Sequence, residues 1–130
     1  MKTNVFVATS LTILLATTLG LAQSRKVSAK IPFEFTAAGK VLPAGQYDFT
    51  YKGNMRVVLV RGADKGSAVN VPIITWLASA MHTTPNDSHI VFDVVGNSHY
   101  LSELWFTGMD GLDLITTKEI HQHETVNVPR

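Results

Sequence analysis

The sequence predicts an all-β protein: an antiparallel β-sandwich or small β-barrel of about seven to eight short strands, preceded by an N-terminal signal peptide. Short runs in which apolar and polar residues alternate recur along the chain, as expected of half-buried strands. Gly and Pro turns separate these runs at intervals of roughly 8–12 residues. Consecutive runs are joined by hairpin turns, which favours antiparallel pairing.

Residues 1–22 have the organisation of a signal peptide. Lys2 supplies a positive charge, and residues 5–21 carry none. Gly20 and Ala22 are the small residues expected at positions −3 and −1 of a cleavage site before Gln23. The alternative is an uncleaved membrane anchor, which would need about 20 strongly apolar residues, whereas Thr and Ser dilute this stretch. We therefore expect a secreted or periplasmic protein with no integral membrane span after cleavage.

Composition limits the function of the mature chain. Cleavage would leave 108 of the 130 residues, enough for one domain with one core. The only charged residue removed is Lys2, so ten of the eleven basic residues remain against ten acidic ones. This balance argues against a nucleic-acid partner, which requires a basic surplus. The chain has no Cys, which excludes disulfides, thiol catalysis and cysteine zinc sites.

The first half of the mature chain is expected to form three strands. The alternating runs are 27–36, 47–51 and 55–61. Pro32 lacks a backbone N–H, which indicates an edge or a bulge within the first run. The Leu42–Gly45 segment, Leu-Pro-Ala-Gly, is a turn, and Gly53-Asn54 is a two-residue hairpin signal.

The second half is expected to add further strands and a polar tail. The β-rich runs are Ala68–Ala78 (broken by Pro72), His89–Val95, His99–Phe106 and Leu112–Thr116. Gly96-Asn97 marks the clearest hairpin, and residues 79–88 read as a polar loop. A short helix over Ile73–Met81 is an alternative. We expect a single all-β domain over residues 23–117 and a fraying polar C-terminal tail over 118–130.

Two motifs resemble a family of small secreted proteins from soil bacteria. The first runs from Ile31-Pro32-Phe33-Glu34-Phe35 through Gly39-Lys40 to Leu42-Pro43-Ala44-Gly45-Gln46-Tyr47, and the second comprises Ile90-Val91-Phe92 and the later Tyr100-Leu101-Ser102-Glu103-Leu104-Trp105. They span most of the mature chain in the order the family has them. The family has no assigned activity, so the resemblance implies a secreted compartment and a β fold rather than a reaction.

The tail contains the one candidate metal-ligand pair. His121 and His123 flank Gln122, so in a strand their side chains would project from one face and two imidazoles could share a metal ion. A flexible polar tail explains the same residues without a metal.

Three aromatic residues, Trp76, Tyr100 and Trp105, are candidates for a binding surface, because aromatic side chains bind sugars and peptides by stacking. Alternation within 99–106 places Trp105 beside Glu103 on the outer face. The same alternation places Leu104 and Phe106 in the core, where we expect Phe92 and Val94 from the partner strand. Burial of Trp105 in the core is the alternative.

No catalytic set emerges from the sequence. Ser98-His99 and Ser102-Glu103 are adjacent in sequence, but neighbours in a strand point to opposite faces. We expect no enzymatic activity and no cofactor, and a non-catalytic binding or assembly module of the envelope or extracellular space, with another protein or a glycan as partner. The alternatives are a small hydrolase or metal-binding protein using His, Asp and Glu residues, and a barrel with an apolar ligand.

Overall fold

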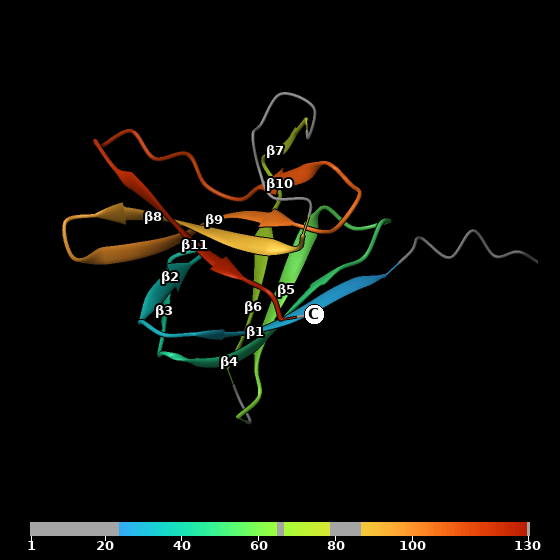
Figure 1. Cartoon of the computed structure of the whole chain (residues 1–130), viewed down its shortest axis with the longest axis horizontal. Helices are drawn as coiled ribbons and strands as arrows, with labels where there is room; N and C mark the ends of the chain where they lie inside the picture. The colour runs from blue at the N-terminus through green and yellow to red at the C-terminus, as the bar shows by residue number, and fades with distance from the viewer. Residues whose placement is uncertain (1–23, 65–66, 79–86, 130) are drawn as a thin grey trace, which may run out of the picture.

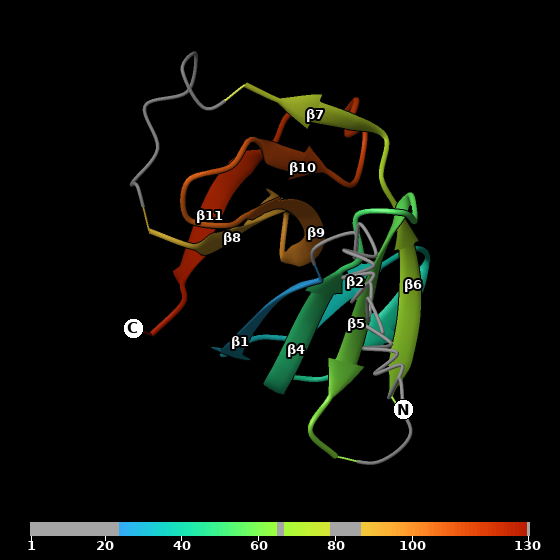
Figure 2. The same cartoon turned by 90° about the vertical axis from the view of Figure 1, so that its right-hand side faces the viewer.

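The computed structural model describes residues 24–64, 67–78 and 87–129, and these ranges contain eleven strands and no helix. The strands form two sheets that face each other without closing into a barrel (Figures 1 and 2). The predicted all-β fold is therefore confirmed, as a sandwich with more strands than expected. The predicted signal peptide, residues 1–22, lies outside the described residues. Within those residues nothing forms a helix that could span a bilayer.

The first sheet is antiparallel throughout, with short connections among its last three strands and a longer connection, residues 32–44, between its first two. Its order is β1-β4-β5-β6, formed by Arg25–Ile31, Gly45–Tyr51, Val57–Gly62 and Ala68–Pro72. One face of each strand is buried: in β4 the residues Tyr47, Phe49 and Tyr51 are buried while those between them are half-buried. The expected strands over 47–51 and 55–61 are thus present with slightly shifted ends.

The second sheet has a less local topology. Its order is β11-β8-β9-β10-β7, formed by Gln122–Asn127, His89–Val95, Ser98–Trp105, Gly111–Asp113 and Thr75–Leu77. A small hairpin of β2 (Phe35–Ala37) and β3 (Lys40–Leu42) joins it by a parallel contact between Thr36 and Tyr100. Since β7 covers 75–77, the helix alternative is wrong for the described part of Ile73–Met81; residues 79–81 lie outside it.

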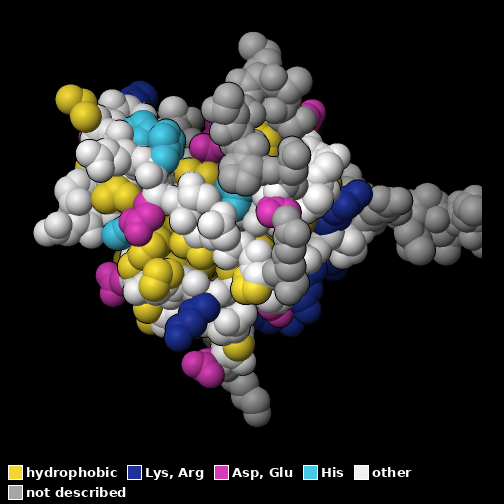
Figure 3. Space-filling view, viewed as in Figure 1, with side chains coloured by type: hydrophobic (Ala, Val, Ile, Leu, Met, Phe, Trp, Pro, Cys, Tyr) yellow, Lys and Arg dark blue, Asp and Glu magenta, His cyan; other side chains and the backbone are white. Residues whose placement is uncertain are grey.

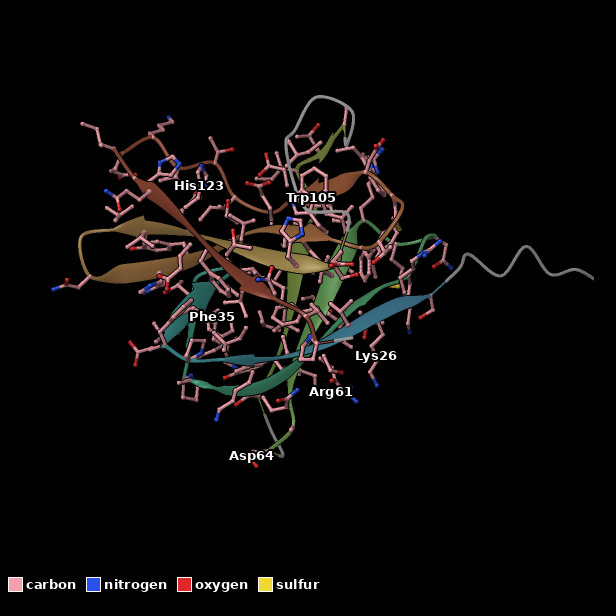
Figure 4. All side chains as sticks on the ribbon, viewed as in Figure 1. Lys26, Phe35, Arg61, Asp64, Trp105 and His123 are labelled. Atoms are coloured by element: carbon pink, nitrogen blue, oxygen red, sulfur yellow. The ribbon has the colours of Figure 1, made fainter. Side chains whose placement is uncertain are left out.

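Pro32 divides the first predicted strand between the two sheets. Residues 27–36 alternate as one strand would, but β1 ends at Ile31 and Phe35 begins β2 in the other sheet. Proline has no N–H to donate to a ladder, so pairing stops there. The break lets Phe35 enter the core, where its ring packs edge-on against Phe92 and Tyr47 at centroid distances of 5.2 and 5.1 Å. In Figure 4 Phe35 lies between the two layers.

The Leu-Pro-Ala-Gly turn is held by the tyrosine that follows it. The Tyr47 hydroxyl donates a hydrogen bond to the carbonyl oxygen of Pro43, and the ring is 2 % exposed. Burial, and to a smaller degree the negative charge of Asp64, raises the pKa of Tyr47. This contact gives the motif a structural reason, because it fixes the turn that brings β4 alongside β1.

A bulge in β9 changes which residues face the core. Phe92 pairs with Leu101 while Val91 pairs with Glu103, so Ser102 is an extra residue in β9. Leu101, Leu104 and Phe106 consequently all reach the core, which a strict period of two does not permit. The predicted burial of Leu104 and Phe106 with Phe92 is confirmed, whereas Val94 is only half-buried.

Trp105 lies on the outer face of the sheet, as expected, but the expected exposure of its side chain is wrong. The side chain lies beside Glu103 on the outer side of the second sheet (Figure 4), but Trp105 is only 3 % exposed. Its indole N–H donates to Glu103 Oε1 at 3.0 Å, and its ring stacks on His89 at a centroid distance of 5.7 Å. Local covering on an outer face, rather than core packing, buries this residue.

The expected fraying of residues 118–130 is also wrong. Six of these residues form β11, which pairs antiparallel with β8 from Gln122↔Val94 to Asn127↔His89. The composition is polar because the strand lies at the edge of the sheet and is largely exposed, so its stability comes from the backbone ladder. The connection from β10 to β11 crosses the outer face of β9 and β8 (Figure 1).

Candidate metal centre

A single carboxylate is buried on the outer face of β8. Ile90 and Phe92 point into the core, so the alternate residues His89, Val91 and Asp93 point outward. The Asp93 side chain is nevertheless only 4 % exposed, because the β10–β11 connection and β11 cover it. A charged group in such a place requires partners that compensate its lost hydration.

The two oxygens of this carboxylate have different surroundings. Oδ2 accepts a hydrogen bond of 2.6 Å from the Thr117 hydroxyl. Oδ1 is buried and has no hydrogen-bond partner. His123 Nδ1 is only 3.0 Å from Oδ1, but the two atoms have the geometry of an ion pair and not of a hydrogen bond. A buried acceptor without a hydrogen bond is uncommon in proteins and calls for a partner.

Strand register brings His123 to this carboxylate. His123 in β11 lies directly opposite Asp93 in β8, so the two side chains share a face. His121 is two residues earlier and projects to the same side, with its Nε2 3.7 Å from Asp93 Oδ1. The two imidazole rings stand at 88° to each other with centroids 5.0 Å apart. The structure therefore places His121 and His123 on one face, as their spacing in the sequence predicted.

A backbone contact sets the tautomer of His121. Its Nδ1 is 2.8 Å from the carbonyl oxygen of Glu119. A carbonyl can only accept, so Nδ1 carries the proton and Nε2 of the neutral ring presents its lone pair toward Asp93. Metal-binding histidines commonly use the second ring nitrogen in this way.

The spacing of the ligand atoms suits a small divalent ion. One atom from each of Asp93, His121 and His123 lies within 4.8 Å of the other two. In a tetrahedral zinc site with bonds of about 2.0–2.2 Å, ligand atoms stand about 3.3–3.6 Å apart. His123 Nδ1 and His121 Nε2 lie 3.0 and 3.7 Å from Asp93 Oδ1, and these two separations bracket that range. Two imidazoles and one carboxylate favour Zn²⁺ or another late first-row ion over Mg²⁺ or Ca²⁺, which prefer all-oxygen sites.

Two further acidic side chains lie near Asp93. Asp113 lies opposite Glu103 in the β9–β10 ladder. Burial raises the pKa of Asp113, and the negative charges of Glu103 and Asp93 raise it further, while backbone hydrogen bonds from Ile115 and Leu114 oppose the shift. Histidine and acidic side chains gather over β8 and β11 in Figure 3. The carboxylates of Asp113 and Glu103 thus lie close enough to Asp93 for their charges to interact.

The three aromatic candidates do not form one surface. Trp76 is on β7 and 49 % exposed; Trp105 is buried under His89; and Tyr100 is half-buried opposite Asp93. Tyr100 lines a hollow of about 170 Å³ with Thr117 and Glu119, two residues that also hold the candidate metal ligands. Only Tyr100 is therefore adjacent to the histidine pair.

Asp93 is the candidate ligand that sequence reasoning missed. It interrupts the otherwise apolar run Ile90-Val91-Phe92-Asp93-Val94-Val95 in the middle of a strand. An isolated carboxylate there is a recognisable signal, because burying it is costly without a partner. Its pairing with His123 depends on β11, and the sequence does not show that β11 returns to β8.

No protein-family model, curated protein or solved structure matches this chain. The chemistry of the site is therefore argued from its own geometry.

Proposed function

We propose that this protein is an exported β-domain that binds a divalent transition-metal ion, with Zn²⁺ as the probe, through Asp93, His121 and His123. The observation that carries the proposal is Asp93 Oδ1, which is buried, makes no hydrogen bond and faces two imidazole nitrogens. A bound cation would supply the missing partner for Oδ1.

Three protein ligands leave a coordination position for water or an external group. Closed structural zinc sites use four protein ligands, whereas sites with three keep a position open. Side-chain exposures of 24 % for His121 and 56 % for His123 place the open side toward solvent. We propose that the domain binds the ion and does not catalyse a reaction. It either captures the ion or uses the bound ion to hold a ligand group of another molecule. The signal-like residues 1–22 support a site that works outside the cytoplasm.

Equilibrium dialysis of residues 23–130 with Zn²⁺, after EDTA treatment, tests the proposal directly. We expect about one Zn²⁺ per chain with a dissociation constant in the micromolar range or below. Asp93→Asn, His121→Ala and His123→Ala should each weaken binding by at least about tenfold, the usual effect of removing a support or ligand.

His99→Gln is the matched control. His99 Nε2 lies 2.7 Å from Glu124 Oε2, so this histidine also bridges to β11 but contributes nothing to the Asp93 site. It should retain full Zn²⁺ affinity. Equal loss in the control and the ligand variants, or wild-type binding weaker than about 1 mM, contradicts the proposal.

A further inference from the structure

A groove with no assigned role lies at the opposite side of the fold from the candidate metal centre. It is formed between the β4–β5 turn and the β6–β7 connection, which meet at one end of the first sheet (Figure 2). Its volume is about 440 Å³. Pockets of about 300–1,000 Å³ are the usual size for small-molecule ligands.

Backbone hydrogen bonds fix both walls of the groove. Ile73 N–H donates to Arg56 O at 2.9 Å and ties the two segments together. Met55 N–H donates to Lys52 O at 2.9 Å within the turn, and Ile74 N–H donates to Asp113 O at 2.8 Å across to β10. Because these contacts hold the walls without a ligand, binding would require little ordering of the backbone.

Exposed apolar side chains contribute to the lining of this groove. Among the described residues five large hydrophobic side chains are exposed, and three of them, Met55, Ile74 and Trp76, line the groove with exposures of 47, 53 and 49 %. Trp76 stands edge-on to the buried ring of Tyr51 at a centroid distance of 5.5 Å and 78°. That contact holds the indole while leaving half of it open, as an aromatic binding wall requires.

A single charge faces this apolar surface. Arg56 is the only charged residue that lines the groove. Its guanidinium makes no ion pair or hydrogen bond within residues 24–64, 67–78 and 87–129. Guanidinium binds carboxylate in a bidentate manner more strongly than it binds neutral acceptors.

From these observations we infer that the groove between Met55, Arg56, Ile74 and Trp76 binds a small amphiphilic carboxylate, with its ring or chain against Trp76 and its carboxylate on Arg56. The inference is independent of the proposed metal site, since no residue is shared between the two.

Calorimetric titration of residues 23–130 with naphthalene-1-carboxylate and with its neutral analogue naphthalene-1-carboxamide tests the inference. The carboxylate should bind at least about tenfold more tightly, the value of one charge-assisted pair. Arg56→Gln should abolish that preference. Arg61→Gln is the matched control, because Arg61 is an exposed arginine on the same strand pair but outside the groove (Figure 4), and it should keep the preference.

A second variant distinguishes an effect of charge on binding from an effect on folding. Met55→Glu adds a carboxylate to an exposed turn residue, and it should weaken naphthalene-1-carboxylate binding at least about tenfold with an unchanged melting temperature. Equal affinity for the two probes, or no binding of the carboxylate up to about 5 mM, overturns the inference. A concentration-dependent dimer that Trp76→Ala abolishes also overturns it, since the groove is then an interface between copies. Adding EDTA to every titration keeps the result separate from metal binding.

Discussion

Trp105 occupies a space that exists because residue 111 has no side chain. A Cβ built on Gly111 would lie 2.5–2.7 Å from three atoms of the Trp105 indole, a separation that real Cβ atoms do not show. Gly111 begins β10 next to β9, so the indole lies flat over its backbone. Gly111 therefore allows the Trp105 indole to pack directly against the backbone of β10.

Gly111→Ala should destabilise the protein by about 1–3 kcal/mol, the usual cost of overpacking a closely fitted site. Chemical denaturation of the variant and the wild type measures the difference. Gly108→Ala serves as the contrasting substitution, because a Cβ there meets nothing within 4 Å. The Gly108 φ of 76° makes the cost of that substitution a backbone effect alone. An unchanged midpoint for Gly111→Ala would mean that the indole moves freely.

Asp113 gives a pH-dependent prediction with a definite sign. Burial is the main reason why its pKa is raised above the ordinary value of an aspartate side chain, about 3.8. Between the two values the folded protein holds more protons than the unfolded chain, so stability falls as pH rises through that window. Above it the ionised carboxylate remains a constant penalty.

Asp113→Asn should therefore raise the melting temperature at pH 7, by a few degrees at most because Asp113 is only partly buried. The gain should shrink as the pH falls and vanish below about pH 3, where Asp113 is protonated in both the folded and the unfolded state. Melting curves from pH 3 to pH 7 check the trend. A gain that persists unchanged at low pH would assign the effect to packing instead of charge.

Among the elements, β11 is the one that a C-terminal truncation can remove without cutting another strand. It covers the edge of β8, its Val126 packs against the core, and Glu124 Oε2 lies 2.7 Å from His99 Nε2. The His99 ring in turn stacks on Phe33 at a centroid distance of 3.8 Å. Removal of β11 would expose six ladder positions of β8 and leave Asp93 without its histidines.

A chain that ends at Thr117 should melt at least about 10 °C lower than the wild type, since about 1 kcal/mol corresponds to 4–8 °C in a domain of this size. Calorimetry and light scattering measure the melting temperature and the association that an uncovered strand edge promotes. A chain that ends at Pro129 is the control and should behave as the wild type. An unaltered cooperative transition without β11 would show that the strand contributes no stability.

The element boundaries show where sequence patterns suffice and where they fail. The hairpin of β8 and β9 was predictable because Gly96 adopts a positive φ of 60°, which the Gly-Asn signal indicates. The extra residue Ser102 was not, because a bulge changes the face of later residues without a composition signal. The same limit applies to β11, whose polar residues suit an exposed edge strand as well as a frayed tail. Only the pairing of β11 with the distant strand β8 distinguishes an edge strand from a frayed tail.

At the scale of the molecule, the class of fold follows from patterning but the site does not. Alternation and turns indicate two apolar faces that must cover each other. His121 and His123 were recognisable as a pair from their spacing. The third group, Asp93, comes from a strand 28 positions before His121, and only the β10–β11 crossing brings the two segments together.

Metal binding should stabilise the whole fold, because its ligands belong to β8 and to the segment that ends in β11. A ligand that binds only the folded state adds about 2.7 kcal/mol at one hundred times its dissociation constant. Thermal melts of residues 23–130 should therefore shift upward with Zn²⁺ and return with EDTA. The same titration of Asp93→Asn should show no shift. A Zn²⁺-induced shift of equal size in that variant would place the ion elsewhere.

The crossing of the β10–β11 connection over β9 and β8 makes the candidate site depend on a single strand pairing. β11 is the last strand of the described chain, and its ladder partner β8 is paired on its other side with β9. The β8–β9 hairpin alone carries Asp93 but neither His121 nor His123. The three groups therefore meet only when β11 has paired with β8, so a chain in which that ladder has opened has no assembled site for an ion.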